Sequence, residues 1–150
     1  MRIAYKKRRN YKYVLAQYCE IQLPLVLEQE IRTRFINLTQ SGSLQLAQHY
    51  AWDGASGPMP DLPSVMRASL VHDALYQLMR EGKLPDSYRK QADQILRNLC
   101  IADGMNVVLA NWVYYCVRSF GRSFVQSDLK WLKSKDTQPG MTTKSSIENI

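Results

Sequence analysis

Four polar residues in the middle of the chain have the types and the spacing needed for acid–base chemistry. His72 and Tyr76 are four residues apart, so on a helix they share a face, whereas Asp73 is rotated from His72 by about 100°. A histidine that acts as a base needs a carboxylate to orient one ring nitrogen, and Asp73 points away from it. Asp93, an acid on the inward side of the next predicted helix, is the candidate for that role.

Each of these residues also has a simpler interpretation. His72 could be a core histidine that bridges two helices, and Asp73 could be an exposed helix acid. Asp93 could form an ion pair with Arg89 or Arg97, each four residues away on the same helix. Solvent exposure would separate the two interpretations of Asp93. The site interpretation of His72 is favoured because its neighbours all fall at the required offsets.

A loop rich in glycine, proline and serine, residues 51–63, comes directly before this helix. We expect Asp73 to face residues 52–57 of the loop. Backbone carbonyls of a glycine-containing loop and one carboxylate are ligands that suit a hard cation such as Ca²⁺. Together with an oriented His72 they describe metal-assisted hydrolysis. Asp53 could add a carboxylate, but an Asp-Gly turn is the favoured interpretation of that residue.

Residues 52–96 resemble the calcium loop and the catalytic helix of secreted phospholipases A2. That family carries Tyr-x-Gly-x-Gly, a short linker, His-Asp-x-x-Tyr, and an aspartate on the next helix. The resemblance implies that His72 is the base, that Asp93 orients it and Tyr76 braces Asp93, and that Asp73 with the carbonyls of Trp52, Gly54 and Ser56 binds Ca²⁺. The chain departs from the family where Ala68, Ser69 and Leu75 replace cysteines and where Ser56 replaces the second loop glycine.

A second resemblance extends from about Tyr11 to Gly121. The run Tyr-Ala-Trp-Asp-Gly-Ala-Ser-Gly-Pro and the helix from Met66 to Tyr76 are similar to a family of uncharacterised bacteriophage proteins. The resemblance implies a viral or prophage origin and no particular mechanism.

Much of the net charge of +7 lies in the first residues of the chain, before the first acid at Glu20. The candidates for contact with a membrane or with phosphate are Lys6, Lys7, Arg8 and Arg9. Such a cluster attracts anionic lipid or nucleic acid, and of these two partners lipid is favoured. A solvated arm without a partner is the slightly favoured interpretation of the cluster.

The hydrophobic pattern predicts an α+β fold: a small N-terminal antiparallel sheet followed by about three helices, of which the first two form a phospholipase A2-like pair. We expect a strand over 11–23, a hairpin of 34–38 and 43–50, and helices over 64–81, 87–101 and 105–120. Ser64 is the expected cap of the first helix. In the third, the predicted inward residues are Val108, Leu109, Trp112, Tyr115 and Cys116.

The predicted organisation is a basic arm over 1–10, one globular domain over 11–133 and a mobile tail over 134–150. An apolar fraction of 45% and a charged fraction of 22% are those of an ordinary globular protein. Three cysteines without metal-ligand spacing are expected to be free thiols. No apolar segment follows the basic start, so we expect no signal peptide, and a location in the host cytoplasm or the virion.

These observations favour a phage-encoded, calcium-dependent lipid ester hydrolase of phospholipase A2 type that uses a His-Asp pair. The alternative is a non-enzymatic phage protein, either structural (virion or tail) or host-interacting, that keeps the helix pair as a scaffold. A third candidate is nucleic-acid binding through the basic arm, for which strong salt dependence would be the evidence.

Overall fold

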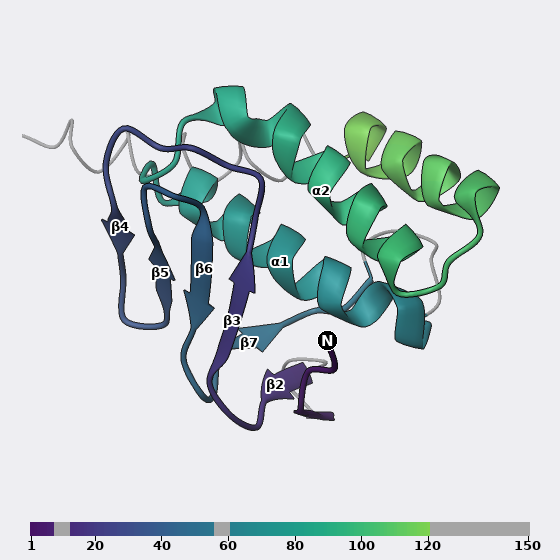
Figure 1. Ribbon diagram of the computed structural model, residues 1–150, viewed down its shortest axis with the longest axis horizontal. Helices are drawn as coiled ribbons and strands as arrows, with labels where there is room; N and C mark the ends of the chain where they lie inside the picture. The colour runs from purple at the N-terminus through teal and green to yellow at the C-terminus, as the bar shows by residue number, and fades with distance from the viewer. Residues whose placement is uncertain (8–12, 56–60, 121–150) are drawn as a thin grey trace, which may run out of the picture.

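The computed structural model describes residues 1–7, 13–55 and 61–120, and it shows a small antiparallel β region followed by three helices (Figure 1). The predicted α+β fold is therefore confirmed. The predicted tail over 134–150 lies outside the described residues. The strands are β1 Tyr5–Lys7, β2 Tyr13–Leu15, β3 Cys19–Gln22, β4 Ile31–Arg32, β5 Ile36–Leu38, β6 Ser43–Leu46 and β7 Ala51–Trp52.

The strands form two sheets, with the orders β1-β2-β7 and β3-β6-β5-β4, and every pairing is antiparallel. The predicted hairpin is confirmed as β5 and β6, with Leu38 opposite Leu44. The prediction of one continuous strand over 11–23 is wrong, because the segment forms two strands, β2 and β3. The chain bends between β2 and β3 because the two segments pair with different partners, Tyr13 with Trp52 and Cys19 with Leu46.

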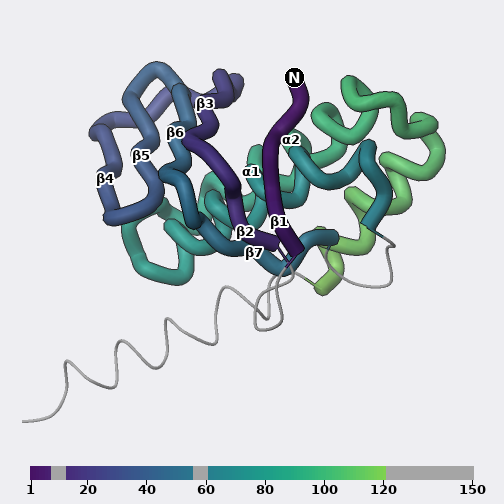
Figure 2. Tube along the Cα trace, turned by 90° about the horizontal axis from the view of Figure 1, so that it is seen from below, coloured from purple at the N-terminus to yellow at the C-terminus, as the bar shows by residue number. Residues whose placement is uncertain are grey.

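Helix α1 (Pro63–Arg80) is the central element, and it packs against the sheets on one side and against the other helices on the other (Figure 2). Pro63 occupies the first turn, where a missing N–H costs nothing. The N-cap is Leu62 and no side chain caps the helix, so the prediction of a Ser64 cap is wrong. A helix that is apolar on most of its circumference must be buried on several sides. His72 is one of the buried residues of α1.

Helix α2 (Arg89–Ala102) follows α1 after a short connection and a 3₁₀ turn, η1 (Asp86–Tyr88). It buries one face, and Asp103-Gly104 ends it as predicted, with Gly104 at φ 95°.

A third helix occupies residues 107–120. Its predicted inward face is wrong for Val108, Trp112 and Tyr115, which are 77%, 44% and 66% exposed, whereas Leu109 and Cys116 are half-buried.

The side chains that the third helix buries are instead Ala110, Val113 and Val117. This helix is apolar on both sides, so the hydrophobic period does not select one of them. Small and β-branched side chains permit a closer approach to α1 and α2 than bulky aromatic ones do, and packing therefore places the aromatics outside.

The three cysteines, Cys19, Cys100 and Cys116, are free, as predicted. A search of the described residues finds no helix with the length and the apolar character that a membrane span requires. Within the predicted basic arm, Tyr5–Lys7 form β1, which pairs with β2 while its side chains remain exposed.

A substitution of Gly54 by alanine is expected to destabilise the fold by about 2–4 kcal/mol. Gly54 has φ 84°, and a Cβ there would lie 2.7 Å from Asp61 Oδ1 and from the Tyr13 ring. Gly104→Ala is the matched control, because Gly104 has φ 95° and no atom within 4 Å of a built Cβ. Gly104→Ala should cost only the backbone strain of about 1–2 kcal/mol. Urea unfolding measures both, and equal losses would show that the space around Gly54 does not matter.

Candidate active site

Helices α1 and α2 pack antiparallel and bring His72 and Asp93 together across their interface. His72 Nε2 lies 2.8 Å from Asp93 Oδ1, so the predicted hydrogen bond between consecutive helices is confirmed. The direction of packing is fixed by a second contact, in which Arg67 near the start of α1 forms a two-bond ion pair with Asp103 just after α2.

Asp93 is fully buried, at 0% exposure, and its carboxylate accepts three side-chain hydrogen bonds. Tyr76 Oη donates to Oδ1 at 2.6 Å, which places the tyrosine where the sequence predicted. Arg118 Nη1 donates to Oδ2 at 2.9 Å from the third helix. Burial alone would raise the pKa of Asp93, but the donated bonds from His72, Tyr76 and Arg118 outweigh it and lower the pKa.

Arg118 is the residue that the sequence analysis missed. The ion-pair alternative supposed that Arg89 or Arg97 pairs with Asp93. The cation that does so is Arg118. Arg89 instead donates to Tyr76 Oη and to the backbone carbonyls of residues 117 and 118, so it fastens the third helix to α2. One signal was present, since Arg118 is the only charged residue in the apolar stretch 105–120. A lone charge on an apolar helix needs a partner.

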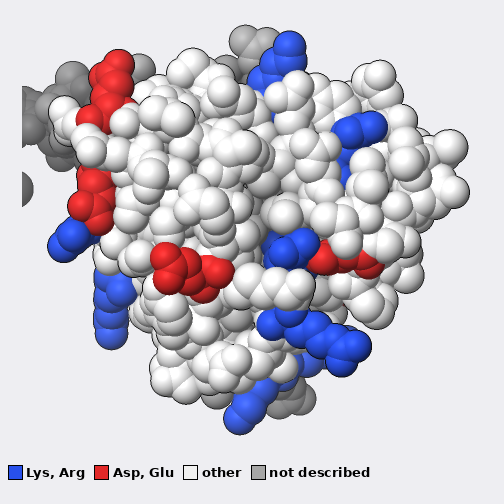
Figure 3. Space-filling model, viewed as in Figure 1, with Lys and Arg blue, Asp and Glu red and all other residues white. Residues whose placement is uncertain are grey.

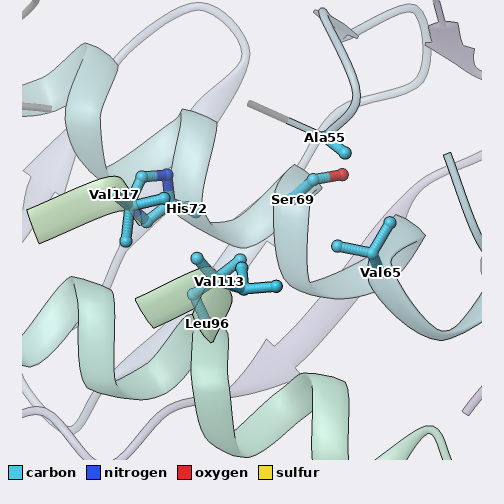
Figure 4. Close-up of a pocket in the computed structure, with 7 residues that line it drawn as sticks. All are labelled: Ala55, Val65, Ser69, His72, Leu96, Val113 and Val117. Carbon is cyan, nitrogen blue, oxygen red and sulfur yellow. The ribbon is translucent and has the colours of Figure 1, made fainter. Parts of the chain in front are cut away.

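The side chain of His72 borders a small cavity (Figure 4). No partner for Nδ1 is found within the described residues, and the cavity has room for about one water molecule. Its lining comes from the loop, α1, α2 and the third helix: Ala55, Val65, Ser69, Leu96, Val113 and Val117. If the Nε2–H tautomer is held by Asp93, Nδ1 carries the lone pair that can accept a proton from that water.

Asp73 faces the loop before α1, as predicted, and diverges from His72. Its Oδ2 accepts a hydrogen bond of 3.2 Å from the backbone N–H of Asp53. Trp52 is buried and its Nε1 donates to Ser69 Oγ at 3.2 Å, so its side chain pins the loop against α1. Asp61 accepts from Ala55 N–H and from Tyr13 Oη, and thereby holds the other end of the described loop.

Asp73 and Asp53 supply negative charge beside the loop, but Arg80 also acts on Asp73 and the described residues form no complete cation site. Burial raises the pKa of Asp73 to about 6, so a positive ion there would offset the cost of an ionised carboxylate. The described residues contain no group of three His, Cys, Asp or Glu side chains able to hold a metal. A cation would therefore depend on loop carbonyls and water, yet at Asp53 the loop presents an N–H. Ser56 lies outside the described residues.

Two of the candidate phosphate contacts lie on β1, at the edge of the sheet β1-β2-β7. Lys6 and Lys7 are exposed on β1, and Arg8 and Arg9 lie outside the described residues. Lys6 pairs with Val14 and Lys7 with Tyr13, so these two consecutive side chains project to opposite faces of the sheet.

A family described as a protein of unknown function (DUF1353) matches residues 38–117, more than half of the chain. The chain belongs to the DUF1353 family. The matched segment contains the loop, His72, Asp73, Tyr76 and Asp93, but it ends one residue before Arg118. No curated protein and no solved structure matches the chain.

In this DUF1353 chain the substitution Asp73→Asn is expected to stabilise the protein above pH 6. The pKa of Asp73 is raised from 3.8 to about 6 in the fold, so its contribution to stability is complete below pH 3.8 and is lost as pH rises through 6. Asparagine is neutral at every pH and can still accept from Asp53 N–H. We expect a gain on the order of 1–3 kcal/mol at pH 7.5 and almost none at pH 3.5.

Thermal unfolding at the two pH values, without divalent cations, measures this gain. Asp86→Asn, at an exposed acid in η1, is the control and should change stability by less than about 0.5 kcal/mol. A loss of stability at pH 7.5 in Asp73→Asn would show that ionised Asp73 has a stabilising partner.

Proposed function

We propose that the chain is a hydrolase of phospholipase A2 type, encoded by a phage or prophage, that cleaves ester bonds of anionic lipids. The observation that supports it most is the buried His72–Asp93 pair, with Nε2 bonded to the carboxylate and the imidazole beside a space for one water. A general base must lie within hydrogen-bond reach of the proton that it takes, and only then does its pKa affect the rate.

In the proposed reaction, Asp93 holds the imidazole in the tautomer that leaves Nδ1 unprotonated. His72 then takes a proton from the cavity water, which attacks the ester carbonyl carbon, and the protonated ring returns the proton to the leaving oxygen. Tyr76 stacks on His72 at 4.0 Å between ring centroids and donates to Asp93, so it limits rotation of both groups.

Calcium is the proposed cofactor, held by Asp73 and by the carbonyls of Trp52, Gly54 and Ser56. When bound, it would supply positive charge for the carbonyl oxygen that becomes negative during attack. The raised pKa of Asp73, about 6, implies that protons compete with the cation. Calcium should therefore raise the melting temperature at pH 7.5 more than at pH 5, and it should not do so in Asp73→Asn.

The test of the proposed function is hydrolysis of phosphatidylglycerol vesicles by the purified full chain, with released fatty acid measured at millimolar Ca²⁺ and in a chelator. Calcium-dependent release that rises with enzyme concentration is the expected result. An absence of release together with an unchanged melting temperature in calcium would overturn the proposal.

The alternative is a non-enzymatic phage protein of the virion or tail, or one that binds a host protein, in which the helix pair is a scaffold. One observation favours it: His72 is only 4% exposed, and Val113 and Val117 of the third helix close the cavity. Such a protein would act in the host cytoplasm or in the virion. Under this alternative His72 and Asp93 serve stability alone.

A further inference from the structure

The outer side of the third helix carries an apolar stripe that nothing in the described part of the chain covers. Val108, Trp112 and Tyr115 are spaced four and three residues apart, so they lie in one row along the helix. All three are exposed. Single exposed apolar residues are ordinary, but a row of them with two aromatics marks an interaction surface.

The charged side chains that reach the surface beside this row are basic, because Asp93, the partner of Arg118, is fully buried. Residues 105–120 contain no acid. Arg97 of α2 donates to Asn111 Oδ1 and Arg118 lies on the helix itself, so two cations follow the flank of the row next to α2. Asp93 in α2 and Asp103 just after it are engaged by Arg118 and Arg67. In Figure 3 the surface over the third helix, at the right, is largely white.

We propose that this face of the third helix, Val108, Trp112 and Tyr115 with Arg97 and Arg118 at its edge, is a docking surface for anionic lipid bilayers. Tryptophan and tyrosine combine an apolar body with a polar tip, which suits the boundary between headgroups and acyl chains. An apolar row with flanking cations on one helix is the arrangement that binds in the plane of that boundary.

The docking surface lies directly outside the candidate active site. Val113 and Val117, on the opposite side of the same helix, line the cavity beside His72. A helix is about 10 Å across, so a bilayer on the outer face would lie about one helix diameter from the imidazole. The idea that the bilayer supplies the substrate of His72 rests on the proposed function. Binding of this surface to a bilayer does not require hydrolysis.

Flotation with vesicles tests the surface without any ester to cleave. Wild-type protein is mixed with vesicles of ether-linked phosphatidylglycerol and phosphatidylcholine, and with vesicles of ether-linked phosphatidylcholine alone. We expect binding to the anionic vesicles that weakens with added salt. Trp112→Gln/Tyr115→Gln should bind at least about tenfold more weakly, since two aromatic side chains no longer leave water.

Tyr18→Gln is the matched control, because Tyr18 is 55% exposed and lies in the bend between β2 and β3, on the other side of the molecule (Figure 1). It should bind as the wild type does. Circular dichroism confirms that each variant is folded. Equal binding by the double variant and the wild type would overturn the proposal. So would a wild-type dimer in lipid-free sedimentation that the double variant does not form, because the occupant would then be a second copy.

Discussion

His72→Gln is expected to lower the rate of ester hydrolysis by about 10²–10⁴-fold while the protein remains folded. Glutamine has a similar size and its amide N–H can donate to Asp93 as His72 Nε2 does. It cannot accept a proton near neutral pH, so the water beside it is no longer activated. Released fatty acid from phosphatidylglycerol vesicles, measured at equal folded concentration, gives the ratio of rates.

The chain offers a matched control because it contains only two histidines. His49 is exposed and lies in the turn before β7, so His49→Gln should keep the wild-type rate. A His72→Gln protein with wild-type activity would remove His72 from the mechanism. The scaffold alternative predicts instead that neither variant nor wild type hydrolyses lipid.

Asp93→Asn is expected to lower the free energy of unfolding by about 3–5 kcal/mol at pH 7. The substitution keeps the shape of the side chain but turns one oxygen into an N–H donor. That group would face donors from His72, Tyr76 or Arg118, so at least one hydrogen bond in a fully buried position is lost. Urea unfolding with two independent probes measures the change.

The pH dependence gives a second check on Asp93. Its pKa is lowered below 3.8 in the fold, so its stabilising contribution is present above pH 3.8 and is lost as pH falls through the lower, folded value. The difference between wild type and Asp93→Asn should therefore be constant at higher pH and shrink in acid. A constant difference down to the lowest pH at which the protein folds would contradict the ion pair.

Asp103→Asn is the control for Asp93, since Asp103 also pairs with an arginine on another helix but its side chain is 17% exposed. It should cost about 1 kcal/mol, less than Asp93→Asn, because water still reaches this partly buried pair. Combining Asp93→Asn with Arg118→Gln should cost less than the sum of the single changes, because both remove the same contact. Additive losses would mean that the two residues are not coupled.

The pairing of His72 with Asp93 could be predicted because it depends on local regularities. The helical period fixes which side chains share a face, so Tyr76 accompanies His72 and Asp73 faces the loop. A short connection between two amphipathic helices makes them antiparallel neighbours, which brings position 93 opposite position 72. The hairpin of β5 and β6 followed in the same way from alternation and a Ser-Gly turn.

Tertiary structure alone decided the features that depend on packing between distant segments. The bend between β2 and β3 exists because the two strands pair in different sheets. The alternation of apolar and polar residues within 11–23 would be the same with or without the bend. The third helix is apolar on both sides, so only the space left by α1 and α2 selects Ala110, Val113 and Val117 as its inner face. That choice turns Arg118 toward Asp93 and leaves Trp112 exposed, because rotating a helix moves every side chain on it together.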